Sequence, residues 1–151
     1  MKHLAYIASG WFNPRQAQDL HNIKAALDNA IDDIGLLYTY YSPKDEIQCD
    51  PTAGAAERNL TFTSNIQAIR DSMCVIVNTR DKDMGTIFEA GVAYALGKPI
   101  IYFADGFEGN FNLMLAQSGI AVCTSVRDLE NTISNFIDNP FMERPYNGVI
   151  E

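Results

Sequence analysis

The positions of apolar residues along the chain predict strands that alternate with helices. Short apolar runs bounded by turn-forming or charged residues are typical of buried strands, and they occupy residues 4–8, 36–41, 73–78, 100–104 and 120–124. The segments between them show helical spacing of apolar residues, at 14–31, 59–70, 86–96, 113–117 and 126–137. Strands alternating with helices imply a parallel sheet with helices on both faces. We therefore expect residues 1–151 to form one α/β domain, a flavodoxin-like three-layer sandwich with a five-stranded parallel sheet.

Several boundaries follow from local chemistry. Asn13 is a good N-cap and Pro14 a good first residue for the first helix, and Gly97 is suited to end the helix over 86–96. Residues 42–58 contain two prolines, one glycine and several charges, which predict a long loop. Loops of that length inside compact domains are usually functional. The last residues, 139–151, predict an irregular tail.

The helix expected over 86–96 carries one charged residue, Glu89, among apolar, small and aromatic residues. A helix that is apolar on all sides is a buried helix, and a carboxylate inside it is costly without a partner or a task. Two interpretations stay open. Thr86 and Glu89 have the spacing of a capping box, with Thr86 as the N-cap. Alternatively, Glu89 and the nearby Asp83 form a functional pair where a parallel strand ends, the usual ligand site of open α/β sheets.

Composition limits which partners the protein is expected to bind and in which compartment it is expected to work. The formal net charge of -8 argues against nucleic acid or an anionic membrane as a partner. The cysteines at positions 49, 74 and 123 have neither paired nor metal-type spacing, which suits a reducing cytoplasm. The N-terminal residues 1–9 turn polar too soon for a signal peptide, and no apolar run is long enough to span a membrane.

Signatures of cofactors are absent from the sequence. No G-x-G-x-x-G follows the first strand, there is no phosphate-binding loop, and His3 and His21 lack ligand-like neighbours. We therefore expect neither cofactor nor metal. The expected topology instead gathers polar and aromatic residues at the carboxyl ends of the strands: Gly10, Trp11, Phe12, Asp83, Glu89, Asn112 and Met114. Taken singly, Trp11 and Phe12 are typical core residues and Asn112 is a typical helix cap.

A carboxylate beside aromatic rings, without a metal or a phosphate loop, fits a carbohydrate or a nucleoside as ligand. Glutamate can attack an anomeric carbon to form a glycosyl-enzyme intermediate, and aromatic rings can stack on a base.

Three segments resemble the nucleoside 2′-deoxyribosyltransferases, in the family's order and over nearly the whole chain. They are residues 6–16 (YIASGWFNPRQ), 83–91 (DMGTIFEAG) and 112–114 (NLM). The ending, residues 146–151 (YNGVIE), matches more loosely. The Asp-x-Gly-x-x-x-Glu-x-Gly pattern is the most specific of these similarities.

The resemblance implies a mechanism. In that family the glutamate matching Glu89 attacks C1′ of a 2′-deoxynucleoside, releases the base and holds the deoxyribosyl group until another base accepts it. Tyr6 orients this glutamate and Asp83 contacts the base. Asn112 and Met114 come from a neighbouring subunit to hold the sugar hydroxyls and cover the site. The resemblance thus implies a cytoplasmic salvage enzyme for 2′-deoxynucleosides and free nucleobases, a dimer or hexamer with shared sites.

The chain departs from the family pattern at two positions that bear on base preference. Asn65 stands where the family usually has a second base-side aspartate, and it borders the apolar stripe expected on the helix over 59–70. An asparagine there can orient a base but cannot donate a titratable proton; the alternative is that Asn65 packs or caps at the helix edge. Glu151 ends the chain where related sequences carry an aromatic residue, and by resemblance it helps to close the neighbour's base pocket.

Two other functions remain open. An N-glycoside hydrolase of deoxynucleosides or their 5′-monophosphates would, for the phosphate, need a serine- or arginine-rich cradle after the first strand, where Trp11 and Phe12 stand. A non-catalytic nucleotide-sensing module would give the buried Glu89 no chemical use.

Overall fold

Five parallel strands form the centre of the molecule, in the order β2-β1-β3-β4-β5. The computed structural model describes residues 3–35 and 37–151. Its strands are β1 (His3–Ala8), β2 (Tyr40–Tyr41), β3 (Ser72–Asn78), β4 (Ile100–Phe103) and β5 (Ala121–Cys123). This order is that of flavodoxin-like sheets and confirms the fold class expected from the sequence.

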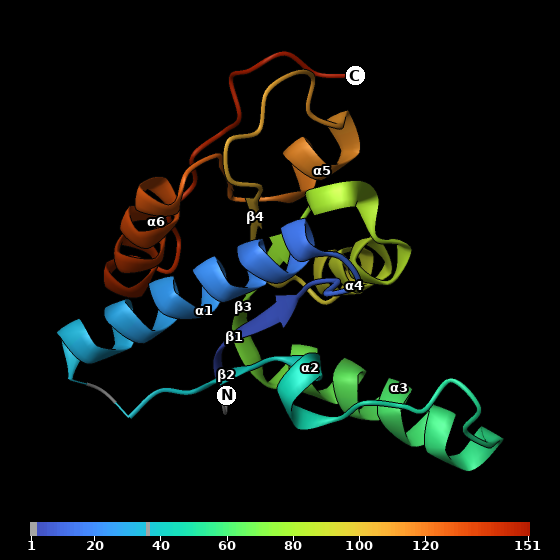
Figure 1. Ribbon diagram of the computed structural model, residues 1–151. Helices are drawn as coiled ribbons and strands as arrows, with labels where there is room; N and C mark the ends of the chain where they lie inside the picture. Colours follow the sequence, from blue (N-terminus) through green and yellow to red (C-terminus); the bar gives the residue numbers. More distant parts are fainter. Residues whose placement is uncertain (1–2, 36) are drawn as a thin grey trace.

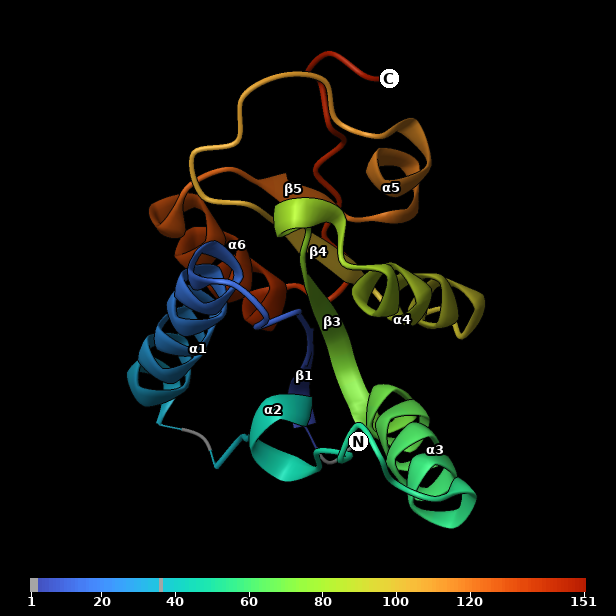
Figure 2. The ribbon, with the colours of Figure 1, turned by 45° about the vertical axis from the view of Figure 1, so that its right-hand side comes forward.

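Helices cover both faces of this sheet. They are α1 (Pro14–Ile34), α2 (Pro43–Glu46), α3 (Ala55–Asp71), α4 (Met84–Ala95), α5 (Leu113–Ser118) and α6 (Val126–Asp138), with a 3₁₀ turn η1 (Arg80–Lys82) before α4. Figures 1 and 2 show α1 and α6 together on one face and α3 and α4 on the other. None of the helices in the described part of the chain is long and apolar enough to cross a membrane.

The central strand β3 supplies both halves of the core. Cys74 and Ile76 belong to the cluster under α1 and α6, whereas Val75 and Val77 belong to the cluster under α3 and α4. Successive side chains of a strand point to opposite faces, so a strand covered on both faces must be apolar at every position. This requirement explains the continuous apolar runs in the sequence.

Two of the three cysteines lie deep in this core. Cys74 on β3 and Cys123 on β5 are buried, and Cys49 is partly exposed. Burial is the main cause that raises the pKa of the Cys74 thiol to about 12 and that of Cys123 to about 11. Both buried thiols therefore remain protonated at neutral pH and pack as small apolar groups.

The second strand and the third helix differ from the sequence prediction. The strand expected over 36–41 is limited to Tyr40–Tyr41, and its first residue, Leu36, lies outside the described residues, as do residues 1 and 2 of the N-terminal segment. The loop expected over 42–58 contains α2, and α3 begins at Ala55 instead of residue 59. The first turn of α3 is exposed, so no apolar stripe marks it, although its residues have good intrinsic helix propensity. Figure 1 shows this end of α3 extending past the sheet.

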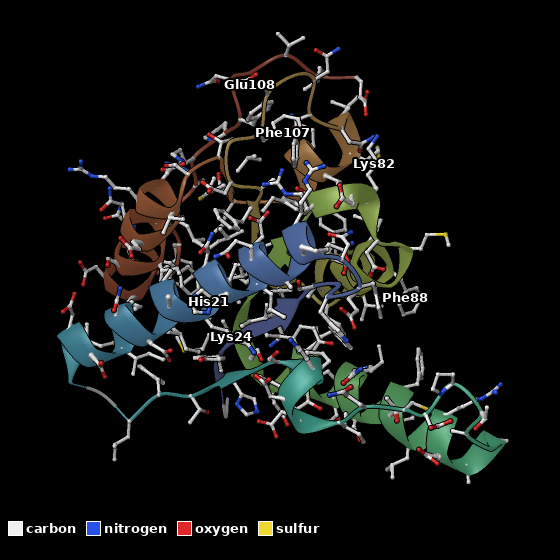
Figure 3. The ribbon with its side chains drawn as sticks, in the orientation of Figure 1. His21, Lys24, Lys82, Phe88, Phe107 and Glu108 are labelled. Carbon is white, nitrogen blue, oxygen red and sulfur yellow. The ribbon has the colours of Figure 1, made fainter. Side chains whose placement is uncertain are left out.

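The apolar composition of helix α4 suggested burial on all sides, but part of the helix is exposed. Phe88 is 54% exposed and Tyr94 63% exposed. The ring of Phe88 contacts Phe62 of α3, with 6.0 Å between ring centroids. Figure 3 shows Phe88 pointing away from the body of the molecule. One face of α4 is therefore an exposed apolar surface in the single chain.

Candidate active site

Tyr6 and Glu89 form a hydrogen bond at the centre of the candidate site. The Tyr6 hydroxyl donates to Glu89 Oε1 at 2.7 Å, which joins residues 83 positions apart. Tyr6 lies on β1 and is fully buried, and Glu89 lies on α4, which follows the adjacent strand β3. The chain order reverses between β1 and β3, and ligands of such sheets bind at this point. The structure thus brings together two of the catalytic residues named from the sequence.

The surroundings of Glu89 alter its ionisation. Its pKa is raised to about 7, chiefly by burial and also by the charge of Asp83, while the hydrogen bond from Tyr6 lowers it. Burial and the charge of Glu89 raise the pKa of Tyr6, so this hydroxyl stays a neutral donor. Near neutral pH a large share of Glu89 is therefore an ionised, poorly hydrated carboxylate, as a nucleophile requires.

Asp83 begins the helix that carries Glu89. Its Oδ2 accepts hydrogen bonds from the backbone N–H and the hydroxyl of Thr86, each at 2.8 Å. The N-cap of α4 is therefore Asp83, and the capping box with Thr86 as N-cap is wrong. The helix begins at Met84, two residues before the expected start at residue 86, so Asp83 stands at the N-cap position. A carboxylate at this position also interacts favourably with the helix dipole. Because Asp83 caps the helix, the carboxylate of Glu89 is left to bond Tyr6.

The turn before Asp83 is fixed by a buried ion pair. Arg80 Nε lies 2.8 Å from Asp19 Oδ2, with side chains only 15% and 4% exposed, and Arg80 also donates to the carbonyl of Asp105. Asp81 and Lys82 follow with φ of 58° and 50°, a left-handed conformation uncommon outside glycine. Arg80 thus ties together α1, the turn into α4 and the loop after β4. Sequence reasoning missed this pair because its members are 61 residues apart.

The loop after β1 separates the roles of its residues. A Cβ on Gly10 would lie 2.7 Å from Gln16 Oε1, the atom that accepts from the Phe12 backbone N–H, so a larger residue here would displace the Gln16 side chain from this hydrogen bond. Trp11 packs against the core under α1, and Phe12 is 72% exposed. Of the two rings, therefore, only Phe12 presents most of its surface for a ligand to stack on.

Asn65 connects to the Tyr6–Glu89 pair through a residue that sequence reasoning missed, Tyr41. The Tyr41 hydroxyl donates to Asn65 Oδ1 at 3.3 Å. Tyr41 and Tyr6 face each other in the register of β2 and β1, and their rings stack with 5.6 Å between centroids. The sequence placed Tyr41 at the end of the strand expected over 36–41, but it did not show which residue of β1 lies opposite Tyr41.

Asn112 and Met114 lie at the start of α5, and Glu151 is the last residue of the chain described. They line a cavity of about 420 Å³ together with Ile87 and Phe107, and neither Tyr6 nor Glu89 is among its lining residues. Figure 3 shows Phe107, Glu108 and Lys82 around this region near α5. Asn112 also caps α5 by accepting from the Met114 backbone N–H at 3.0 Å. Within one chain these residues are therefore not assembled with the nucleophile.

The C-terminal tail docks on its own chain beside this cavity. Phe111 N–H donates to the carbonyl of Val149, and Glu151 N–H donates to the carbonyl of Phe111. Lys82 Nζ lies 3.5 Å from Glu151 Oε1. The family resemblance implied that this end of the chain closes a neighbour's base pocket, whereas in the single chain it pairs with the segment around Phe111 of the same chain.

The raised pKa of Glu89 predicts a pH-dependent contribution to stability. The folded protein keeps a proton up to about pH 7 that an ordinary glutamic acid releases near pH 4.5. The protonated Glu89 therefore contributes about 3 kcal/mol to the free energy of unfolding. This contribution is fully present at pH values below the unfolded pKa and is lost as the pH rises through the folded pKa. Glu89→Gln cannot ionise, so its free energy of unfolding relative to the unsubstituted protein should be higher near pH 8 than near pH 5. Urea denaturation at both pH values measures this difference, and equal differences would contradict it.

The residues described show no group of three or more His, Cys, Asp or Glu side chains that could hold a metal ion.

Comparison with known proteins agrees with the resemblance. The sequence profile described as nucleoside 2-deoxyribosyltransferase matches residues 5–125. The structure is similar to a 2-deoxyribosyltransferase of Bacillus psychrosaccharolyticus, with a TM-score of 0.70 and 26% identity, covering 94% of this chain and 98% of that one. No curated protein sequence matches the chain significantly.

Two more distant structures share the fold. A conserved protein of Enterococcus faecalis has a TM-score of 0.68 and 18% identity, over 89% of this chain and 99% of that one. The CMP N-glycosidase of Clostridium botulinum has a TM-score of 0.57 and 17% identity, over 87% and 98% of the two chains. Because the family's sequence profile matches residues 5–125, the chain belongs to the nucleoside 2-deoxyribosyltransferase family.

Proposed function

We propose that this protein transfers the 2-deoxyribosyl group between purine and pyrimidine bases through a covalent intermediate on Glu89, with retention at C1′. The observation that carries the proposal is the hydrogen bond from Tyr6 to Glu89 Oε1. It holds one oxygen of a partly buried carboxylate at the switch point of the sheet and leaves the other oxygen for attack. Membership of the family supports the reaction class.

The first step breaks the glycosidic bond. Glu89 Oε2 attacks C1′ of the 2′-deoxynucleoside, a C1′–O bond forms, and the electron pair of the C1′–N bond leaves with the base. The departing base takes up a proton, and the carboxyl group of Asp83, on the base side of the site, donates it. Phe12 supplies an exposed ring at the same edge of the sheet.

The second step reverses the first with another base. A ring nitrogen of the incoming base attacks C1′ and loses its proton to Asp83, and the C1′–O bond breaks to return the carboxylate of Glu89. Tyr6 then stabilises the departing carboxylate by the hydrogen bond already in place. Two inversions at C1′ give net retention. If water attacks in place of a base, the same intermediate is hydrolysed.

We further propose that the complete site needs a second copy of the chain. In one chain Asn112 and Met114 line a cavity apart from Glu89 and Tyr6. The exposed rings of Phe62 and Phe88 provide apolar surface beside Glu89. Such surface is typical of subunit contacts. A neighbouring subunit that presents Asn112 and Met114 to Glu89 would hold the sugar hydroxyls and cover the site.

Hydrolysis of nucleoside 5′-monophosphates has less support from the geometry. After β1, the Ser9 hydroxyl donates to the Gly10 carbonyl and accepts from Asn78, so it is occupied inside the protein. The nearby Arg15 pairs with Asp81 at 3.5 Å. Neither side chain is placed as part of a phosphate cradle.

One assay separates the candidate functions. The protein is incubated with deoxyinosine and free cytosine, and the products are resolved by chromatography. Deoxycytidine indicates transfer, whereas hypoxanthine without deoxycytidine indicates hydrolysis. A parallel incubation with deoxycytidine 5′-monophosphate tests for the nucleotide hydrolase. Nucleoside binding without any product would indicate the sensing module. Glu89→Ala is the control for contaminating activity.

Shared sites predict complementation between two inactive variants. Glu89→Ala lacks the nucleophile and Asn112→Ala lacks the sugar contact, but a mixed pair contains one intact site. When the two variants are co-expressed, random pairing should restore about a quarter of the unsubstituted activity. Each variant expressed alone is the control. Co-purified mixed pairs without transfer activity would contradict shared sites.

A further inference from the structure

Tyr41 covers one face of the residue that holds the nucleophile. Its ring lies 5.6 Å from that of Tyr6, centroid to centroid, with 10° between the ring planes. Its own hydroxyl donates to Asn65 Oδ1 on α3. Its ring also contacts that of His3 in a T-shaped arrangement, with 5.7 Å between the centroids and 62° between the ring planes. The contacts run in one series, from Asn65 through Tyr41 and Tyr6 to Glu89.

The stacking of Tyr41 on Tyr6 affects the hydrogen bond to Glu89 because the Tyr6 hydroxyl lies at the far end of the side chain, beyond the ring. A small tilt of the ring moves the oxygen enough to lengthen the 2.7 Å contact with Glu89. Hydrogen bonds weaken steeply as distance and angle depart from their optimum. A neighbouring ring that packs face to face resists such a tilt, and a parallel β-register keeps the two tyrosines abreast.

We propose that Tyr41 is a positioning residue for the nucleophile: its stacked ring fixes the Tyr6 hydroxyl on Glu89, and Asn65 fixes Tyr41. The inference rests on the proposed function for the role of Glu89 as nucleophile. It gives Asn65 a task beyond the base pocket, because this asparagine then acts on the glycosidic step through two aromatic rings. Tyr41 itself need not touch the substrate.

The charged groups around this series determine the sign of the effect. Glu89 is faced by Tyr6 from β1, by Tyr41 from β2 and by Asp83 from the start of its own helix. Tyr41 is further influenced by Glu46 of α2, and burial is the main cause that raises its pKa, so its hydroxyl stays neutral. Since the Tyr6 hydrogen bond lowers the pKa of Glu89, a displaced Tyr6 should raise that pKa.

The test compares Tyr41→Leu with Tyr40→Leu. Tyr40 is the preceding residue of β2 and packs against the core on the other face of the sheet, so it controls for loss of an aromatic ring from this strand. The ionisation of Glu89 is followed by ¹³C NMR of its labelled carboxyl carbon in the full-length protein. Tyr41→Leu should raise the pKa of Glu89 by about half a unit or more, and Tyr40→Leu should leave it unchanged. In the transfer assay, the acid limb of the pH–rate profile should move upward by the same amount.

Two milder variants keep the inference testable if Tyr41→Leu does not fold. Tyr41→Phe retains the stack without the bond to Asn65, and Asn65→Ala removes the same bond from the other side. Both should raise the pKa of Glu89 in the same direction by a smaller amount. An unchanged pKa in Tyr41→Leu, or in both milder variants if it cannot be made, would overturn the inference. Because the titration needs no turnover, a shifted pKa in a protein without transfer activity would refute the proposed function alone.

Discussion

Replacing Glu89 by alanine is expected to lower the rate of deoxyribosyl transfer at least ~1,000-fold, which corresponds to about 4 kcal/mol of barrier. The reason is that no other carboxylate in the described structure accepts the Tyr6 hydrogen bond that places the nucleophile. Chromatography of the products from deoxyinosine and cytosine measures the loss. Full activity in the alanine variant would rule out the covalent mechanism.

Matched measurements separate lost chemistry from lost structure. Glu89→Gln keeps an acceptor for Tyr6 and nearly the same volume, so it should fold well and be as inactive as the alanine variant. In the unsubstituted protein, a 2-fluoro-2-deoxyarabinosyl nucleoside should leave the mass of its sugar on the peptide that contains Glu89. The same reagent should leave no added mass on either variant.

The second large effect is expected at the buried ion pair of Arg80 and Asp19. Arg80→Met keeps much of the side-chain volume but leaves Asp19, which is 4% exposed, without its partner. A buried charge that loses its partner typically costs 3–5 kcal/mol, and we expect a decrease of about this size in the free energy of unfolding. Urea denaturation near neutral pH, followed by circular dichroism, measures it.

The neighbouring surface pair provides the control. Arg15 lies 3.5 Å from Asp81, and its side chain is 68% exposed, so Arg15→Met should cost less than about 1 kcal/mol. The double variant Asp19→Leu with Arg80→Met removes both buried charges and should recover much of the lost stability. If Arg80→Met changes stability no more than Arg15→Met does, the buried pair does not stabilise the turn into α4.

The sheet was predictable because burial on both faces leaves a continuous apolar signature. Every residue of β3 from Cys74 to Asn78 is buried, and the corresponding run is plain in the sequence. The start of α1 was predictable for a local reason, since the Asn13 side chain accepts from the Gln16 backbone N–H as an N-cap should. Its end was not, because α1 continues to Ile34, beyond the expected residue 31. Strand β2 was harder, because it lies at the sheet edge, contains only Tyr40–Tyr41 and is only partly buried.

Helix starts without an apolar stripe escaped prediction. The first turn of α3 is solvent-exposed, so its residues give no periodic signal. At α4, Thr86 and Asp83 both qualify as N-caps from composition, and only the three-dimensional hydrogen bonds show that Asp83 is the cap. The exposure of Phe88 and Tyr94 likewise could not be inferred from their apolar character.

Some residues of the candidate site were expected before the structure was known, and others were missed. The pairing of Tyr6 with Glu89 was expected from the family resemblance, and no spacing rule connects residues 83 positions apart. Tyr41 and the Arg80–Asp19 pair were missed because both depend on contacts between distant segments. Asn112, Met114 and Glu151 share one cavity, and their part in the reaction stays a prediction about a neighbouring subunit.

The buried cysteines make the unaltered chain suitable for thiol labelling. Alkylating reagents react with the thiolate, and burial keeps the pKa values of Cys74 and Cys123 at about 12 and 11. At neutral pH a maleimide dye should therefore attach at the partly exposed Cys49, without any engineered site. Two populations labelled with donor and acceptor dyes could then report subunit exchange in real time. Slow further labelling would reveal how often strands β3 and β5 open to solvent, since their thiols react only after the core has parted.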